Sequence, residues 1–537
     1  MKEHIKEKIP IYFLLAVEIL FILYCTLQNF VLCEDFSLLS IHGIDDAAFA
    51  ESVRKLYASQ GMEELLVQND FGYGWIYWIS VALFTLPGKF LYDQGITSVL
   101  YILLPRFYSM IFAILSVYVF YRLCRVYIKS PWLVATATLL FPLFPTMMHF
   151  SQRFSTTPSM TFFALLCVYF IVKDERLKPG SFWCSSLSLA IALGIKLTAV
   201  AIVPLFLLLM FSRFAWKFNK ENIIIWVKVG IPSAYLALFC VSPAIALTPL
   251  FKEQSLASRM TIVQFIQSAA GKDVSLLKNM ENGIIKGQMY WPLYAILFFC
   301  LCTVTIIKFK QKDSRKSEWG GLLSGYMIGI VLICKTATNG PTYATMYSTI
   351  LSFIPLLSLA LFECVSSLKI TGCVVSAGLL LGQTYYINPS NASGFAFPIN
   401  FFMQTALTSQ SEIQLVSELK SVSQRYADEN GLTEYIIVID AGLPNFLPKL
   451  SNKYVDCYSC WNDLQNWNLQ PVTFIVLDKI DDSRLWYLPH EQRTDGSLAE
   501  DYADRQALIE TGLLQGISWD LIEETDEYYF FARAQGQ

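Results

Sequence analysis

The sequence predicts a polytopic α-helical membrane protein with about 11 transmembrane helices and a soluble C-terminal α/β domain. Composition is the first reason: 54% of the 537 residues are hydrophobic, 15% are charged, and the mean hydropathy is +0.45. A soluble globular chain carries about 25% charged residues. The other two reasons are a series of apolar segments of bilayer length and a change of net charge towards the C-terminus.

Eleven apolar segments are long enough, or nearly long enough, to cross a bilayer. The first is retained as a helix, because it is too long for a signal peptide and lacks a small-residue cleavage site. The segments lie at about 10–33, 105–127, 131–148, 157–173, 181–195, 197–212, 223–246, 289–307, 319–335, 343–364 and 368–386.

Basic residues between these segments predict the direction in which each one crosses, because cytoplasmic loops are enriched in Lys and Arg. All the basic groups face the cytoplasm only if the further apolar segment 74–92 does not cross. We therefore interpret 74–92 as a juxtamembrane or re-entrant helix. A cytoplasmic N-terminus and eleven spans then place the C-terminal region outside. The basic groups lie at 2–8, 122–129, 173–178, 213–220, 308–316 and Lys369.

Charge divides the chain into two parts. Residues 391–537 carry 22 acidic and 9 basic side chains, a net charge of −13, whereas residues 1–390 carry 21 acidic and 31 basic ones, a net charge of +10. We predict a transmembrane domain over 1–390 with a large outer loop at 34–104, and an extracytoplasmic α/β domain over 391–537. The expected location is the inner or plasma membrane. The overall net charge of −3, without a dense basic tract, argues against nucleic acid as a partner.

Two neighbouring carboxylates, Asp45 and Asp46, stand in the outer loop before an amphipathic segment in which Phe49, Val53 and Leu56 recur at helical spacing. One interpretation is that Asp45 caps the N-terminus of this helix. The other is that a carboxylate at the membrane boundary acts as a general base. The two are compatible, because one carboxylate suffices for the cap. We assign Asp45 as the candidate catalytic base, with Asp46 orienting it or acting in its place.

Three cationic residues fall at the outer ends of apolar segments: Arg106 opens the second, Arg153 follows the third, and Lys196 lies between the fifth and sixth. For any one of them, a side chain that reaches towards the interface is the simpler interpretation. Lys335 ends the ninth segment on the same face. Charges near hydrocarbon are costly and usually functional, so the gathering of these cations favours a site for a phosphate at the headgroup level of a lipid.

Two tyrosines, Tyr343 and Tyr347, lie four residues apart at the outer start of the tenth segment. They either belong to the interfacial aromatic belt or line a pocket for a sugar or a lipid phosphate. With His149, they are our candidate substrate-binding residues. The four histidines are scattered, so the sequence does not indicate a histidine metal site. Cys457 and Cys460 either form a disulfide or remain two thiols.

Five stretches carry a resemblance to a known family. They are the acidic motif 44–49, the helix 106–122 that begins with an arginine, the hairpin 193–198 with its glycine and lysine, the aromatic-to-proline run 343–355, and the tail segment 437–446. The chain resembles the type C (GT-C) glycosyltransferases, specifically the bacterial glycosyltransferase family 39 and its relatives, the protein O-mannosyltransferases and lipid A aminoarabinose transferases. The tail segment resembles the α/β domain that many members carry.

The resemblance implies a polyprenyl-phosphate-linked sugar donor and an inverting transfer to a glycan, lipid or protein acceptor on the outer face. The charged residues fit this activity, with Arg106, Arg153 and Lys196 on the donor phosphate and Asp45 as the base. The donor is already activated, so no nucleotide or metal ion is required, and a divalent metal is not indicated.

Two other classes of protein compete with a glycosyltransferase. A transporter or flippase of lipid-linked sugars would carry charged or broken helices near the bilayer midplane and inverted repeats, and the sequence shows neither. A membrane-anchored sensor whose tail binds a ligand would not need eleven spans as an anchor. The sequence therefore favours the enzyme over both.

The predicted topology can be tested with reporter fusions. A reporter fused after Gly95 should read as external, because segment 74–92 returns to the side from which it started. A matched fusion after Lys129 should read as cytoplasmic. A cytoplasmic reading at Gly95 would contradict the eleven-span arrangement and the placement of the charged residues on the outer face.

Overall fold

The structure is a computed structural model. It describes residues 9–20, 23, 52–53, 56–67, 74–96, 99–139, 141, 151, 154–174, 178–213, 219–250, 291–311, 316–336, 410–440, 454–460, 469–470, 472–478, 506–525 and 528–534.

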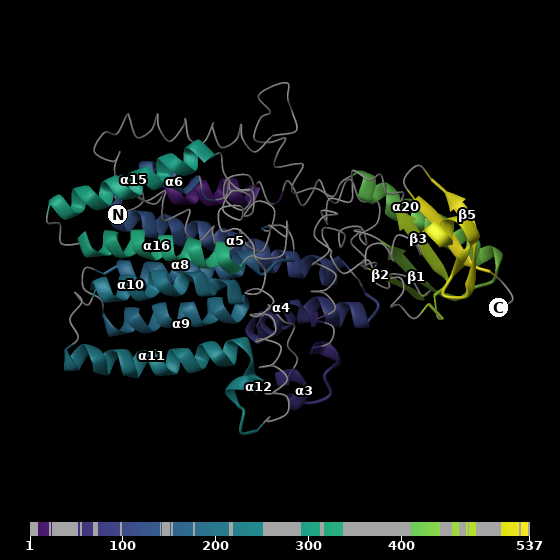
Figure 1. Cartoon of the computed structure of the whole chain (residues 1–537), viewed down its shortest axis with the longest axis horizontal. Helices are drawn as coiled ribbons and strands as arrows, with labels where there is room; N and C mark the ends of the chain where they lie inside the picture. Colours follow the sequence, from purple (N-terminus) through teal and green to yellow (C-terminus); the bar gives the residue numbers. More distant parts are fainter. Residues whose placement is uncertain are drawn as a thin grey trace. The chain divides into compact units, whose positions relative to one another are not determined.

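The chain divides into two compact units, a helical one that includes Ser52–Leu86 and Leu104–Ala406, and a second that includes Pro87–Leu103 and Leu407–Gln537. The predicted combination of a helical part with a C-terminal sheet domain is confirmed. The helices of the first part are shown in Figure 1. They are a segment over Ile9–Leu20, α3 (Met62–Val67), α4 (Trp75–Asp93), α5 (Val99–Tyr127), α6 (Pro131–Leu139), α8 (Thr157–Val172), α9 (Pro179–Ile195), the 3₁₀ helix η2 (Leu197–Ile202), α10 (Val203–Arg213), α11 (Lys220–Val241), α12 (Pro243–Ala246), α15 (Trp291–Lys310) and α16 (Lys316–Thr336).

Every predicted apolar segment that the structure describes coincides, wholly or in part, with helix. The segments 343–364 and 368–386 lie outside the described residues. Within the described part, Leu103–Tyr127 and Lys220–Val241 are long and apolar enough to cross a bilayer, and several shorter apolar helices accompany them. The number of eleven spans therefore stays a prediction.

The helix boundaries follow from local sequence. Pro158 and Pro179 stand in the first turns of α8 and α9, where a missing backbone N–H costs nothing and the fixed φ suits a helix. The Asn219 side chain caps α11 by accepting a 2.8 Å hydrogen bond from the backbone N–H of Asn222. The predicted helix 197–212 is instead two pieces, because η2 follows the extended residue Lys196 and only Val203–Arg213 is α-helical.

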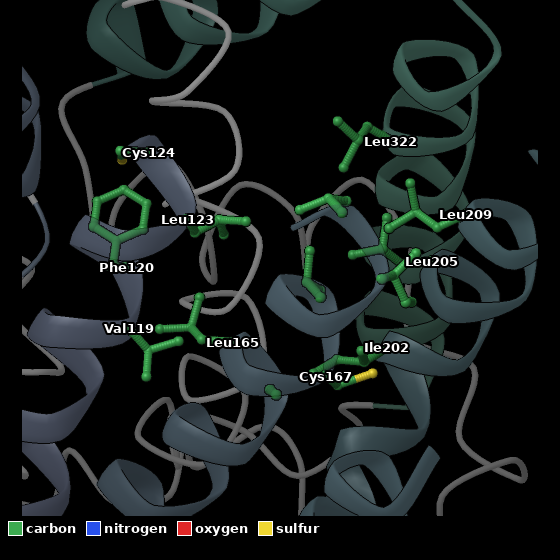
Figure 2. Packing of buried hydrophobic residues seen from close by; sticks show 14 of the residues in the cluster. Val119, Phe120, Leu123, Cys124, Leu165, Cys167, Ile202, Leu205, Leu209 and Leu322 are labelled. Carbon is green, nitrogen blue, oxygen red and sulfur yellow. The ribbon is translucent and has the colours of Figure 1, made fainter. Parts of the chain in front are cut away.

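One apolar core joins α5, α8, η2, α10 and α16. Small residues let α16 lie directly against α10: a Cβ atom on Gly325 would come within 2.5 Å of the Cα atom of Leu205. Figure 2 shows part of this core, with Val119, Phe120, Leu123 and Cys124 from α5, Leu165 and Cys167 from α8, Ile202 from η2, Leu205 and Leu209 from α10, and Leu322 from α16.

Helices α5 and α8 run in the same direction, as shown by contacts along their length. The rings of Phe112 and Phe162 are 5.4 Å apart. Two to three turns later along both helices, Arg122 donates a 3.2 Å hydrogen bond to the hydroxyl of Tyr169. The ends of α5 and α8 therefore lie at the same end of the bundle, as the predicted topology requires.

A buried ion pair ties three further helix ends together at this same end. Arg213, at the end of α10, contacts Glu318, in the first turn of α16, at 3.1 Å. The hydroxyl of Tyr127, the last residue of α5, donates to the same carboxylate, which is 1% exposed. The basic helix ends thus gather at one end of the bundle, which we call the basic end. Its cytoplasmic orientation stays a prediction.

Helix α4 begins at the opposite end of the bundle. The backbone N–H of Gly74, one residue before α4, donates to the carbonyl of Ile195 at the end of α9. Figure 1 shows α4 beyond the ends of α9 and α11 and not alongside them. The helix matches the apolar segment 74–92, and it is not among the described helices that are apolar enough to cross. The position of α4 agrees with the prediction that segment 74–92 does not cross the membrane beside the other helices.

The second unit contains a mixed six-stranded sheet preceded by a helix. The strand order is β2-β1-β3-β6-β5-β4, in which β1 pairs in parallel with β2 and β3 and the other neighbours are antiparallel. Apolar clusters cover both faces, one of them including Val422 of the helix. The elements are α20 (Gln410–Glu429), β1 (Glu434–Asp440), β2 (Tyr454–Cys460), β3 (Phe474–Asp478), β4 (Leu513–Leu514), β5 (Ile517–Glu524) and β6 (Tyr528–Arg533).

The tail cysteines Cys457 and Cys460 both lie on β2, three residues apart. A disulfide between them and two separate thiols both stay predictions.

Candidate functional site

Lys196 occupies a break between two helices. Helix α9 ends at Ile195, and Lys196 takes an extended conformation with φ −152° and ψ 125°. Its backbone N–H still bonds to the carbonyl of Ala192, and its own carbonyl accepts from Ala199 as η2 begins. The break turns the chain at the end of the bundle opposite the basic end, and it leaves the lysine only 5% exposed.

Two glycines allow three backbones to meet beside this lysine. A Cβ atom on Gly74 would lie 1.7 Å from the carbonyl oxygen of Gly194. A Cβ atom on Gly194 would lie 2.3 Å from the Cβ atom of Cys240, near the end of α11. Only glycine fits at either position, and the contact sets the start of α4 against the ends of α9 and α11.

The first turn of α4 extends this contact to two more segments. Tyr77 is completely buried, and its ring lies 6.0 Å from the ring of Tyr108 and 6.3 Å from that of Phe154. Ser80, one turn further along α4, shares a 2.7 Å hydrogen bond with the hydroxyl of Tyr108. Tyr77 thus joins the start of α4 to α5 and to the segment before α8.

Each of these segments carries one of the predicted cations. Arg106 stands two residues before Tyr108 in α5 and is 5% exposed. Arg153 immediately precedes Phe154 in the sequence, and Lys196 immediately follows Ile195. The structure therefore brings the three cation-bearing segments together around the first turn of α4. We call the set Gly74, Tyr77, Arg106, Tyr108, Phe154, Gly194 and Lys196 the α4 junction.

Buried hydroxyl groups fix the segment after Arg153. The Ser109 hydroxyl lies 3.1 Å from both the backbone nitrogen and the carbonyl oxygen of Ser155, donating to the oxygen and accepting from the N–H. The Ser155 hydroxyl in turn accepts from the N–H of Thr157, at 3.2 Å. These bonds satisfy polar groups that would be costly in an apolar core, and they hold the start of α8 against α5.

Sequence reasoning identified two of the described residues of this junction, Arg106 and Lys196. It missed Tyr77 and Tyr108, and it placed the aromatic residues after Gly74 in a juxtamembrane or re-entrant helix. For Tyr77, the available signal is the aromatic run after Gly74, which lies outside the eleven apolar segments. Tyr108 lies within the apolar segment 105–127, where an aromatic residue is not distinctive. The other predicted site residues lie outside the described residues: Asp45, Asp46, His149, Arg153, Tyr343 and Tyr347.

A metal site was not indicated by the sequence. In the part of the chain that the structure describes, no three His, Cys, Asp or Glu side chains gather where they would hold a metal ion.

Comparison with known proteins supports the fold class. No family model matches the chain, and no curated protein matches it. The structure is similar to the crystal structure of the Archaeoglobus fulgidus oligosaccharyltransferase in complex with Zn and sulfate. The TM-score is 0.51 and the sequence identity 10%, and the match covers 87% of this chain and 68% of that chain.

The likeness concerns the fold alone, at this level of identity. The helical part and the C-terminal sheet domain together resemble the fold of that structure. The resemblance to the GT-C glycosyltransferases, and to family 39 among them, stays a prediction.

The junction can be tested by adding one methyl group. Gly194→Ala should lower the free energy of unfolding by about 1 to 3 kcal/mol, because its Cβ atom would overlap Cys240. Thermal unfolding of the purified chain in detergent measures the change. Gly180→Ala is the matched control on the same helix, since nothing lies within 4 Å of its added Cβ atom. Equal stability of the two variants would contradict the close contact.

Proposed function

We propose that this chain is an integral-membrane glycosyltransferase. It moves a sugar from a polyprenyl-phosphate-linked donor to a glycan, lipid or protein acceptor on the outer face of the membrane, with inversion at the anomeric carbon. The observation that carries the proposal is the gathering of the segments of Arg106, Arg153 and Lys196 at the α4 junction.

The electrostatics of this junction suit a leaving phosphate. The second ionisation of a phosphate monoester has a pKa of about 6, so a polyprenyl phosphate departs as an anion and needs no proton from an acid. Arg106 and Lys196 are both buried, and fixed positive charges act more strongly in a low-dielectric site than in water. We assign them, with Arg153, to the phosphate of the donor.

The proposed reaction is a single displacement. The acceptor hydroxyl oxygen forms a bond to the anomeric carbon while the bond from that carbon to the phosphate oxygen breaks. The electron pair leaves with the phosphate, and the hydroxyl proton passes to the Asp45 carboxylate, with Asp46 orienting it. Attack opposite the leaving group inverts the anomeric carbon. The donor is activated as a phosphate ester, so this step requires neither a nucleotide nor a metal ion.

The fold likeness adds independent support for sugar transfer. The similar structure is named an oligosaccharyltransferase and was solved with sulfate, a tetrahedral oxyanion like phosphate. We assign to this chain the same general class of reaction, with His149, Tyr343 and Tyr347 as candidate contacts of the sugar or the lipid phosphate.

Removing the lysine should weaken donor use. Lys196→Ala should raise the activation free energy of transfer from the lipid-linked donor by about 2 kcal/mol or more. A loss of this size is expected when one partner of a partly desolvated charge pair is removed. Lys196→Arg should retain part of the activity, because the charge remains. Transfer assays with donor titration measure both variants. Unchanged transfer by the alanine variant would assign this lysine to interfacial packing.

Removing the base should slow transfer without unfolding the chain. Asn caps a helix as well as Asp does, so Asp45→Asn preserves a cap while it removes the basicity. We expect transfer to fall by about a hundredfold or more, with normal expression and donor binding. Asp46→Asn is the matched comparison, because adjacent helical positions point about 100° apart. Full activity in both variants would remove the acidic pair from the mechanism.

The same variants separate an enzyme from a flippase. An Asp45→Asn protein that no longer transfers sugar but leaves movement of the lipid-linked sugar across the membrane unaffected supports the enzyme. Loss of lipid movement in the same variant, with no sugar transfer detectable in the wild type, would replace the proposal with transport.

A further inference from the structure

A stripe of exposed side chains runs along α5 towards the basic end. Ile111, Leu115 and Tyr118 are 42%, 37% and 38% exposed, and the exposed Arg122 follows them. Their spacing of four, three and four residues places all four on one face of the helix. The face is therefore apolar for two turns and cationic at its end.

Helix α8 repeats this pattern beside α5. Phe162, Leu166 and Tyr169 follow one another at the same spacing of four, three and four residues, and Lys173 ends the series. All four are partly exposed. Since α5 and α8 run in the same direction, each stripe ends in a tyrosine and a cation at the same end of the bundle.

Direct contacts join the two stripes. The Arg122 guanidinium donates a 3.0 Å hydrogen bond to the Tyr118 hydroxyl on its own helix and a 3.2 Å bond to the Tyr169 hydroxyl on α8. Its central carbon lies 5.9 Å from the centre of each tyrosine ring. These contacts hold the guanidinium between the two helices. The Lys173 ammonium lies 4.5 Å from the centre of the Phe170 ring.

This arrangement offers several donors to an anion. A guanidinium has five N–H groups, of which the two tyrosines accept two. Each tyrosine hydroxyl accepts from Arg122 and keeps its own proton for donation. Arg122 stands five residues before the end of α5, about 7.5 Å along the axis, which is the depth of headgroups when the helix end is at the membrane surface. An amphipathic anion fits both the apolar stripes and the cationic ends.

We propose that the α5–α8 face binds one anionic phospholipid, whose phosphodiester contacts Arg122, Lys173 and the two tyrosine hydroxyls while an acyl chain lies along the apolar stripes. The lipid comes from the leaflet at the basic end, the cytoplasmic leaflet in the predicted topology. This site is distinct from the α4 junction, which lies at the opposite end of the bundle. It rests on the membrane location and does not depend on the reaction.

Arg125 provides a matched control on the same helix. Its guanidinium donates to backbone carbonyls of its own chain, at 3.4 Å to Ile128 and more closely to Lys129. Arg125→Gln removes the same charge as Arg122→Gln, three residues away and at the same end, without touching either tyrosine. The pair separates a specific site from a general effect of positive charge.

The test counts lipids bound to the full-length chain. Delipidated protein in detergent is titrated with phosphatidylglycerol, and bound lipid is measured by native mass spectrometry; phosphatidylcholine and inorganic phosphate are the comparisons. We expect tighter binding of phosphatidylglycerol than of phosphatidylcholine, little competition by inorganic phosphate, and a loss of about fivefold in Arg122→Gln with no change in Arg125→Gln. Equal losses in both variants, or displacement of the lipid by inorganic phosphate, would overturn the proposal.

A second pair of variants keeps the test decisive if Arg122→Gln does not fold. Tyr169→Phe keeps the ring and removes the hydroxyl that holds the guanidinium, and Lys173→Gln removes the second cation. Each should weaken phosphatidylglycerol binding while leaving the unfolding temperature of the chain unchanged. Unaltered binding in both variants would exclude the α5–α8 face as the lipid site.

Discussion

The contact between Gly74 and Gly194 is the constraint on which the candidate site depends. A Cβ atom on Gly74 would overlap the carbonyl of Gly194, a Cβ atom on Gly194 would overlap Cys240, and Gly74 bonds to the carbonyl just before Lys196. Because α4 starts at this contact, Tyr77 is placed where it reaches both α5 and the segment before α8. A displacement of α4 would separate the three segments that carry the cations. The positions of the cations therefore depend on a contact between uncharged residues.

Most of the helical fold could be predicted from the sequence, because the helices coincide with the apolar segments. A bundle of helices is one of the few structures that bury so many apolar residues. The gathering of the basic helix ends at one end was also predictable from loop charge. The break at Lys196 was not, because the residues of η2 are as apolar as those of an α-helix and only the backbone of Lys196 departs from helical geometry. The length of α10 was overestimated for the same reason.

The candidate site was predictable where its residues are chemically unusual for their surroundings. Arg106 and Lys196 stand out as charges in apolar segments, and the structure places both in buried positions at the α4 junction. Tyr77, Tyr108 and the serines that fix the start of α8 gave no such signal, because aromatic and hydroxyl side chains are common throughout a membrane protein. Their importance comes from contacts between segments far apart in sequence, which neither periodicity nor composition records.

The ion pair between Arg213 and Glu318 has a consequence for the order in which the protein is assembled. The two residues are 105 positions apart, and each is buried in the finished bundle. An unpaired buried charge is costly, so Arg213 stays in contact with water or lipid headgroups until the ribosome has produced α16. The burial of this helix end therefore follows the synthesis of Glu318, late in the assembly of the bundle.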